Sequence, residues 1–281
     1  MQVWNGLPAW MDRRRDLEGR TLGFVPTMGA LHRGHASLVE RCRRENEIVV
    51  ASIFVNPTQF NDASDLARYP RTLDRDLLLL ESLGADHVLA PSAAGLPTER
   101  AQRNAAAALS GVSEDAAASC ALYPHGYRFR VECDRSYIVM EGASRPGFLQ
   151  GVMTVVLKLL NIVRPHRAYF GEKDFQQLKV VREMVEDLFI PTEIVPCPTV
   201  REESGLAESS RNALLSPGDR TKAASLFRVL TTAVSPSEAR AALEAEGFAV
   251  DYVEEHWGRR FAAASLGHVR LIDNIALPDR P

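Results

Sequence analysis

The sequence predicts an α/β protein, in which a Rossmann-like, doubly wound parallel sheet is followed by a smaller C-terminal α+β domain. Two observations support this prediction. Along residues 1–198, short apolar and β-branched runs that suit buried strands alternate with apolar residues at helical spacing. After the proline-spaced stretch 196–198 the alternation gives way to a mixed pattern. We therefore expect a large domain over residues 1–198 and a small α+β domain over residues 199–281.

The first strand–helix–strand unit lies within residues 21–55. The run 22–25 predicts a strand, and the β-branched run 48–55 predicts a second one. Between them an apolar stripe with helical spacing predicts a helix, formed by Leu38, Val39 and Cys42. Residues 1–20 precede this unit, and we expect them to form a helix or arm with apolar anchors at Trp4, Leu7 and Trp10.

The later elements continue the alternation as far as the predicted boundary. We expect a leucine-rich helix that opens at Arg71-Thr72 and stops at Gly84, strands at 87–90, 167–170 and 192–195, and helices at 152–163 and 178–188. Beyond the boundary we expect helices at 226–233 and 237–246 and a strand at 267–274. The stretch 196–198 is interpreted as a linker.

Composition excludes several classes of protein. A net charge of -3 with both signs scattered leaves no basic stripe for nucleic acid. The four cysteines have no Cys-x-x-Cys spacing, so neither a zinc site nor a disulfide framework is expected. The N-terminus lacks an apolar signal core, and the apolar stretch 152–163 is too short to span a bilayer. We therefore expect a cytoplasmic protein without a nucleic-acid or membrane partner.

Two predicted strand-to-helix turns contain the candidate site residues. His32 and His35 follow the strand 22–25, at the sheet edge where open α/β sheets bind ligands. A helix N-terminus there offers N–H groups to an anion, and Gly34 allows a phosphate to approach the backbone without meeting a Cβ. The turn 171–174 follows the strand 167–170 at the same edge of the sheet. Together the two turns predict a site for the phosphates of a nucleotide.

Several motifs resemble, in this order, those of the pantothenate synthetase (pantoate–β-alanine ligase) family, within the HxGH nucleotidyltransferase superfamily. The resemblance extends from about residue 21 to the end of the chain. The motifs are Pro26-Thr27-Met28-Gly29-Ala30-Leu31-His32-Arg33-Gly34-His35, Ser52-Ile53-Phe54-Val55-Asn56-Pro57-Thr58-Gln59-Phe60, Tyr69-Pro70-Arg71-Thr72, Gly171-Glu172-Lys173-Asp174-Phe175-Gln176-Gln177 and Ser209-Ser210-Arg211-Asn212.

The resemblance implies a ligase of coenzyme A precursor synthesis. In that family ATP and pantoate form pantoyl adenylate and pyrophosphate, and β-alanine then displaces AMP to give pantothenate. It also implies a homodimer and magnesium as the metal that accompanies ATP. Two alternatives stay open at this point: a related nucleotidyltransferase that uses another acceptor, and a nucleotide-binding relative that has lost catalysis.

The same resemblance assigns roles to residues of this chain. The catalytic set is His32, His35, Lys173, Ser209, Ser210 and Arg211. The ATP-binding set is Pro26, Met28, Gly34, Gly171, Asp174 and Val200. The pantoate-binding set is Met28, Asn56, Gln59 and Gln177, and Asp76 is the candidate metal ligand.

The chain departs from the family pattern at several points. Glu208 replaces the usual methionine or leucine before the two serines, and a carboxylate there should repel the triphosphate. Phe148-Leu149 replaces a histidine–phenylalanine pair, and Arg75 interrupts the acidic residues Asp74 and Asp76. An alanine-rich insertion at about 93–121 is interpreted as a surface excursion, with a lid or an interface element as the alternative.

Overall fold

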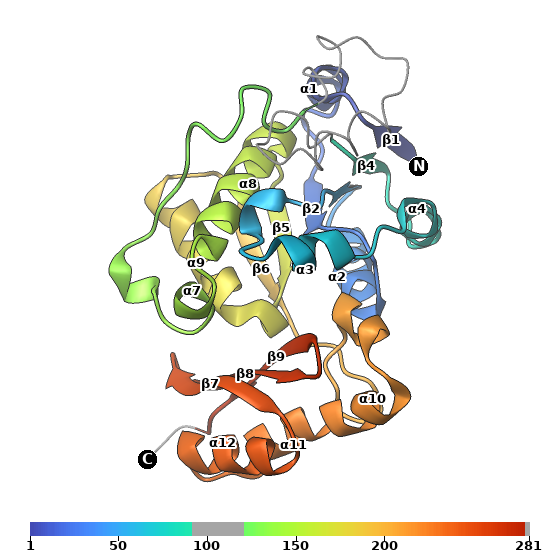
Figure 1. Cartoon of the computed structure of the whole chain (residues 1–281). Helices are drawn as coiled ribbons and strands as arrows, with labels where there is room; N and C mark the ends of the chain where they lie inside the picture. The colour runs from blue at the N-terminus through green and yellow to red at the C-terminus, as the bar shows by residue number, and fades with distance from the viewer. Residues whose placement is uncertain (92–120, 279–281) are drawn as a thin grey trace. The chain divides into compact units, whose positions relative to one another are not determined.

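The computed structural model describes residues 1–91 and 121–278. Within them the chain forms two compact units (Figure 1). The larger unit comprises Met1–Leu31, His35–Phe170 and Gln177–Cys197. The smaller unit comprises Pro198–Pro281 together with the short segments His32–Gly34 and Gly171–Gln176, which the predicted division assigned to the first domain. Nearly all of the alanine-rich insertion, expected at about 93–121, lies outside the described residues.

The larger unit is built on a six-stranded sheet with the order β1-β4-β3-β2-β5-β6. Strand β2 pairs in parallel with both β3 and β5, and β4 pairs in parallel with both β3 and β1. The chain therefore adds strands on one side of β2 and then on the other, which places the switch in strand order between β2 and β5. The strands are β1 (Gln2–Trp4), β2 (Leu22–Thr27), β3 (Ile48–Ile53), β4 (His87–Leu89), β5 (Arg167–Gly171) and β6 (Glu193–Cys197).

Helices cover both faces of this sheet, which confirms the predicted doubly wound architecture (Figure 1). Because crossovers between parallel strands are right-handed, α2 and α4 lie on one face and α1, α8 and α9 on the other. The helices are α1 (Leu7–Asp16), α2 (Arg33–Glu45), α3 (Ala63–Arg68), α4 (Leu73–Ser82), α7 (Glu141–Ser144), α8 (Phe148–Val163) and α9 (Phe175–Asp187), with 3-10 turns η1 (Pro57–Gln59), η2 (Arg135–Tyr137) and η3 (Glu172–Asp174).

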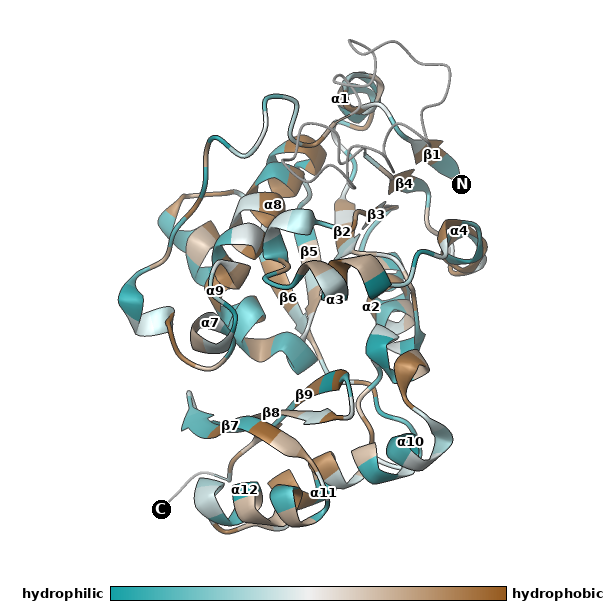
Figure 2. Cartoon of the chain, in the orientation of Figure 1, coloured by the Kyte–Doolittle hydropathy of each residue, from teal (hydrophilic) through white to brown (hydrophobic). Residues whose placement is uncertain are grey.

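Close packing fixes the helices on both faces. A Cβ at Gly23 of β2 would lie 2.3 Å from Sγ of Cys42, so glycine is needed for α2 to approach the sheet so closely. On the other face the fully buried Trp10 of α1 donates from Nε1 to the carbonyl of Ile162 at 3.0 Å. Apolar residues, brown in Figure 2, recur along α8, whose buried positions continue over its whole length.

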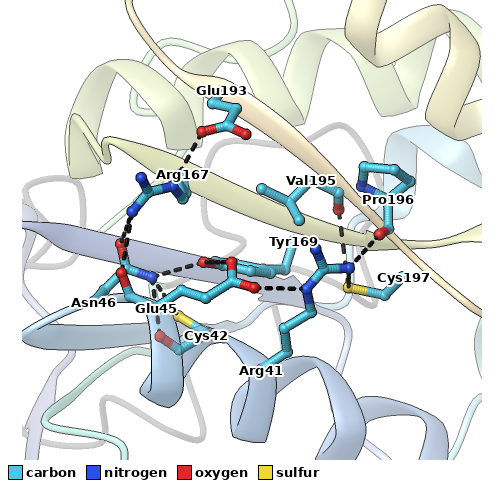
Figure 3. Close-up of polar contacts among 10 residues, drawn as sticks. All are labelled: Arg41, Cys42, Glu45, Asn46, Arg167, Tyr169, Glu193, Val195, Pro196 and Cys197. Carbon is cyan, nitrogen blue, oxygen red and sulfur yellow. Dashed lines mark hydrogen bonds and ion pairs between the residues drawn. The ribbon is translucent and has the colours of Figure 1, made fainter.

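A polar network anchors the C-terminal end of α2 to β5 and β6 (Figure 3). The Tyr169 hydroxyl donates to Glu45 at 2.8 Å and accepts from Nδ2 of Asn46 at 2.7 Å. Arg41 donates to Glu45 at 2.9 Å and to the carbonyl of Pro196 at 2.7 Å. Because Asn46 is buried and all these groups are paired, the network fixes the C-terminal end of α2 on the sheet.

The smaller unit has an antiparallel sheet in the order β7-β8-β9, with helices packed against it. Its core joins Leu226 and Val229 of α11 and Leu243 of α12 to Ala262 and Leu271 of the sheet. The elements are η4 (Ser210–Leu214), α10 (Pro217–Ala223), α11 (Ser225–Thr232), α12 (Pro236–Ala245), β7 (Ala249–His256), β8 (Arg259–Leu266) and β9 (Val269–Ala276).

Several elements differ from the sequence-based expectation. Residues 1–20 contain strand β1 as well as the expected helix. Strand β6 continues through Pro196 to Cys197, so a linker beginning at Pro196 was wrong; the sheet edge tolerates a proline, which has no N–H to donate. Strands β7 and β8 were missed. They form a tight hairpin through Trp257 and Gly258, which both have positive φ.

No helix in the described residues is long and apolar enough to cross a membrane. The described cysteines Cys42, Cys133 and Cys197 are free thiols, while Cys120 lies outside the described residues.

Candidate active site

The turn after β2 is held by a buried carboxylate. Asp76, 1% exposed, accepts from the backbone N–H of Ala30 at 2.8 Å and of Leu31 at 2.9 Å, one on each oxygen. Gly29 and Ala30 both have positive φ, so these bonds stabilise a conformation that Ala30 rarely adopts. Thr72 adds a third hydrogen bond to the carboxylate at 3.1 Å. The structure thus gives Asp76 the role of a loop anchor.

A metal-binding role for Asp76 has no support from its surroundings. Its two oxygens already accept three hydrogen bonds. Among residues 1–91 and 121–278 no group of three or more histidine, cysteine or acidic side chains could hold a metal ion. A protein cage for magnesium therefore does not form around the residue that the sequence suggested.

His32 immediately precedes α2, and its ring is fixed by the glycine of the motif. The Gly34 N–H donates to Nδ1 of His32 at 3.1 Å, so the neutral ring carries its proton on Nε2. A Cβ at Gly34 would lie 2.8 Å from Cε1 of the same ring. The glycine is therefore required for the histidine to pack, and its N–H is engaged by the ring, where the sequence suggested open access for a phosphate. His35 follows in the first turn of α2 and is half-buried.

The electrostatics around His32 keep it neutral. Its pKa is lowered to about 4, chiefly by burial and next by the Lys173 ammonium, while the Asp174 carboxylate acts in the opposite direction. Lys173 and Asp174 therefore both interact electrostatically with His32. At neutral pH His32 is a donor through Nε2–H, and Lys173 is the cation of the cluster.

Lys173 lies in η3, and a residue from the end of the chain holds its backbone. Nζ of Lys173 lies 3.8 Å from the Asp174 carboxylate. Asn274 of β9, 2% exposed, donates from Nδ2 to the carbonyls of Glu172 at 3.0 Å and Lys173 at 2.8 Å. Its Oδ1 accepts from Nε of Arg259 at 2.6 Å. Asn274 thus positions the lysine turn, and its only signal in the sequence is the polar pair Asp273-Asn274 between apolar residues of β9.

The predicted serine loop closes on itself around a buried asparagine. Ser209 caps η4 by accepting from the N–H of Arg211 at 3.3 Å, and Ser210 is the first residue of η4. Asn212 donates to the carbonyl of Ala207 at 3.0 Å. Its buried Oδ1 has no hydrogen-bond partner in the described part of the chain. Lys173, Ser209 and Asn212 line one small cavity, so the structure brings two predicted catalytic residues together there.

Glu208 lies beside the histidine motif. Its carboxylate is 3.9 Å from Nη1 of Arg33, with side-chain exposures of 13% and 72% respectively. Burial is the first cause that raises the pKa of Glu208, and the neighbouring Glu202 is the second. The backbone N–H of Glu208 donates to the carbonyl of Val200 at 2.9 Å, which ties the predicted ATP-binding valine to the start of the serine loop.

Two of the predicted pantoate-binding amides, Asn56 and Gln59, are buried and bonded to each other. Asn56, 1% exposed, donates to Oε1 of Gln59 at 3.0 Å and to the carbonyl of Gly151 at 3.2 Å. Its Oδ1 accepts from the hydroxyls of Thr58 at 2.9 Å and Tyr123 at 3.3 Å. Asn56 therefore has its polar groups engaged by protein, and it fixes the Gln59 amide with the NH₂ group directed away from Asn56.

The remaining predicted residues lie on neighbouring elements. Pro26 belongs to β2, Met28 follows it, and Gln177 lies in the first turn of α9; all three are half-buried. Gly171 ends β5 and caps η3 with φ −76°, a conformation open to any residue. Sequence reasoning missed Tyr123, which served only to mark the end of the insertion although it is 1% exposed and bonded to Asn56.

Comparison with known proteins gives a consistent result. The sequence matches the pantoate-beta-alanine ligase family over residues 2–276. It is 48% identical over 269 residues to a pantothenate synthetase of Bdellovibrio bacteriovorus, covering 96% of this chain and 95% of that protein. It is 44% identical over 278 residues to one of Legionella pneumophila (strain Lens), covering 99% and 100%.

Solved structures agree with the sequence comparison. The fold is similar to that of a pantoate-beta-alanine ligase from Francisella tularensis complexed with beta-gamma ATP and beta-alanine, with a TM-score of 0.85 and 37% identity over 98% of this chain and 97% of that one. It is similar to a pantothenate synthetase from Thermus thermophilus, with a TM-score of 0.82 and 41% identity over 99% and 100%. The chain therefore belongs to the pantoate–β-alanine ligase family.

Proposed function

We propose that the residues described above carry out the ATP-dependent condensation of pantoate with β-alanine, through a pantoyl adenylate, releasing pyrophosphate and AMP. The match to the family over residues 2–276 is the observation that supports this reaction. The Francisella relative was solved with beta-gamma ATP and beta-alanine, and we carry both ligands over to this chain.

The first step needs compensation of negative charge more than a covalent nucleophile. A pantoate carboxylate oxygen forms a bond to the α-phosphorus of ATP, and the bond from that phosphorus to the bridging oxygen breaks, so that pyrophosphate leaves with the electron pair. Lys173 supplies a positive charge to the phosphates, and the neutral His32 donates from Nε2. His35, Ser209, Ser210 and Arg211 complete the phosphate-binding set, with Gly171, Asp174 and Val200 toward the nucleotide.

The second step releases AMP. The amine of β-alanine forms a bond to the acyl carbon, the bond to the AMP oxygen breaks, and the amine loses a proton. In both steps the pantoate hydroxyls contact Gln59 and Gln177, and Met28 packs against its methyl groups. The Asn56 amide is engaged by Gln59, Gly151 and Thr58, and we therefore propose that Asn56 acts on pantoate through Gln59.

Magnesium enters this reaction with ATP. The described residues provide no cage of acidic or histidine ligands, and magnesium commonly binds through substrate phosphates and only one or two carboxylates. We therefore propose that MgATP is the substrate, and that Asp174, whose side chain is 43% exposed, is the nearest candidate for an outer contact. We further propose that the protein is cytoplasmic and forms a homodimer; sedimentation equilibrium of the purified chain tests the dimer.

One assay tests the reaction and separates the alternatives. ATP, magnesium and pantoate without β-alanine should release pyrophosphate in a burst of about one equivalent per site, and AMP should follow only when β-alanine is added. A relative that uses another acceptor would bind ATP but would show no pantoate-dependent burst of pyrophosphate. A relative without catalysis would bind ATP and release no pyrophosphate with any acid.

Lys173→Met tests the phosphate role within that assay. Losing one such donor typically slows the step by about a hundred- to a thousand-fold. Lys222→Met, a change of the same charge at an exposed position of α10, is the control and should keep the burst. If Lys173→Met keeps its burst and loses only the β-alanine step, the assignment of Lys173 to the phosphates is wrong.

A further inference from the structure

The segment that precedes α8 begins with an unusual backbone. Met140, 1% exposed, caps α7 with φ 46° and ψ −115°, a region that residues other than glycine rarely adopt. Its conformation turns the chain so that the next residue, Glu141, points into the protein, with its side chain 7% exposed. A buried carboxylate needs a partner, because its desolvation is costly otherwise.

Arg145, one helical turn later, is that partner, and it also reaches η1. Nη1 of Arg145 donates to the Glu141 carboxylate at 3.1 Å, and Nη2 donates to the backbone carbonyl of Gln59 at 3.1 Å. The guanidinium carbon lies 3.9 Å from the centre of the Phe148 ring. Because the guanidinium is a rigid planar fork, a carboxylate on one arm and a ring beneath it fix the direction of the other arm.

The 3-10 turn η1 also packs against α8, so closely that Gly151 has no room for a side chain. A Cβ at Gly151 would lie 2.4 Å from the carbonyl oxygen of Thr58 and 2.8 Å from the N of Gln59. Asn56 adds a bond to the carbonyl of Gly151 and another to the Gln59 amide. Gln59 is therefore held at its side chain by Asn56 and at its backbone by Arg145.

We propose that Arg145, oriented by Glu141 and Phe148, is a positioning residue for Gln59 and thereby sets the affinity for pantoate. This inference rests on the proposed role of Gln59 in binding pantoate. It also gives a role to a departure from the family pattern, since Phe148 stands where the family has a histidine and supplies the aromatic face beneath the guanidinium. Arg145 touches no substrate in this scheme and acts only through η1.

A double-mutant cycle on the full-length chain tests this. KM for pantoate, KM for ATP and kcat are measured for the wild type, Gln59→Ala, Arg145→Gln and the double variant, with Arg182→Gln at an exposed position of α9 as the matched control. Losing one charge-assisted hydrogen bond predicts that Arg145→Gln raises KM for pantoate about ten-fold and leaves KM for ATP and kcat within about two-fold. In the Gln59→Ala background, Arg145→Gln should raise KM for pantoate by less than about two-fold.

Glu141→Gln keeps the side-chain volume and weakens the pair, so it tests the inference even if Arg145→Gln folds poorly. It should raise KM for pantoate less than Arg145→Gln does, and Arg145→Lys should fall between the wild type and Arg145→Gln. The inference would be overturned if Arg145→Gln raised KM for pantoate as much in the Gln59→Ala background as in the wild type. It would also be overturned if Arg145→Gln raised both KM values and lowered kcat by similar factors. Failure of the proposed function is a different result: the wild type would then show no pantoate-dependent pyrophosphate release at all.

Discussion

The protonation of His32 offers a direct test of its proximity to Lys173. Burial and Lys173 lower the pKa of its ring from 6.5 to about 4, which corresponds to about 3 kcal/mol at 1.36 kcal/mol per pH unit. Because the pKa in the folded protein is below the unfolded value, the folded protein binds fewer protons between pH 4 and 6.5. The contribution of neutral His32 to stability is therefore complete above pH 6.5 and is lost as the pH falls through that interval.

Lys173→Met is the perturbation that reports on the geometry. Removing the ammonium should raise the pKa of His32, but the value should stay below 6.5, because burial is the larger cause and remains. Lys222→Met, which removes the same charge from an exposed site, should leave the pKa of His32 unchanged.

The assay is an NMR titration of the histidine Cε1–H resonances from about pH 2.5 to about pH 8, which brackets the expected midpoint, with the His32 signal assigned by its loss in His32→Gln. In the wild type this signal should hardly move above pH 5.5. Saturating ATP should shift its midpoint upward, since phosphate charge favours the protonated ring. A wild-type midpoint near 6.5 would refute the buried neutral ring, and an unchanged midpoint in Lys173→Met would refute the proximity of the lysine.

Three further predictions follow from single contacts. Glu208→Gln should lower KM for ATP by up to about five-fold at pH 8 and leave kcat unchanged. This difference in KM should shrink as the pH falls toward the raised pKa of Glu208, because the wild-type side chain then also becomes neutral. A higher KM for ATP in Glu208→Gln would mean that the carboxylate helps to bind ATP. Gly151→Ala should lower stability by about 1–3 kcal/mol in thermal melts and raise KM for pantoate, because its Cβ meets the backbone of η1, whereas Gly218→Ala should change neither. Asp76→Asn should cost about 1–3 kcal/mol of stability, because it leaves one buried N–H unpaired, and should leave the magnesium requirement unchanged. The control Asp74→Asn, at an exposed position, should change neither stability nor the magnesium requirement. A many-fold higher magnesium requirement in a fully stable Asp76→Asn variant would restore the metal-ligand role.

Local pattern was sufficient for much of the fold. The alternation of strands and helices predicted the doubly wound sheet, and helix α4 and strand β4 lie within two residues of their expected bounds. The misses have physical causes. Strand β8 contains three consecutive alanines, which have low strand propensity, so its strand character depends on pairing with β7 and β9 on both sides. Strand β6 tolerates Pro196 only because the sheet ends there.

Within the candidate site, sequence and tertiary structure determined different things. The sequence by itself determined the family and the positions of the reactive side chains, because motifs such as His32-x-Gly34-His35 are contiguous in the chain. Only the tertiary structure decided what each polar group is bonded to: the proton position on His32, the anchoring by Asp76, the engaged amide of Asn56 and the hold of Asn274 on the lysine turn. Buried polar groups must find partners, and several of those partners, such as Asp76 for Ala30 and Asn274 for Lys173, are far apart in sequence. No local pattern records such pairings, so they appear only once the chain is folded.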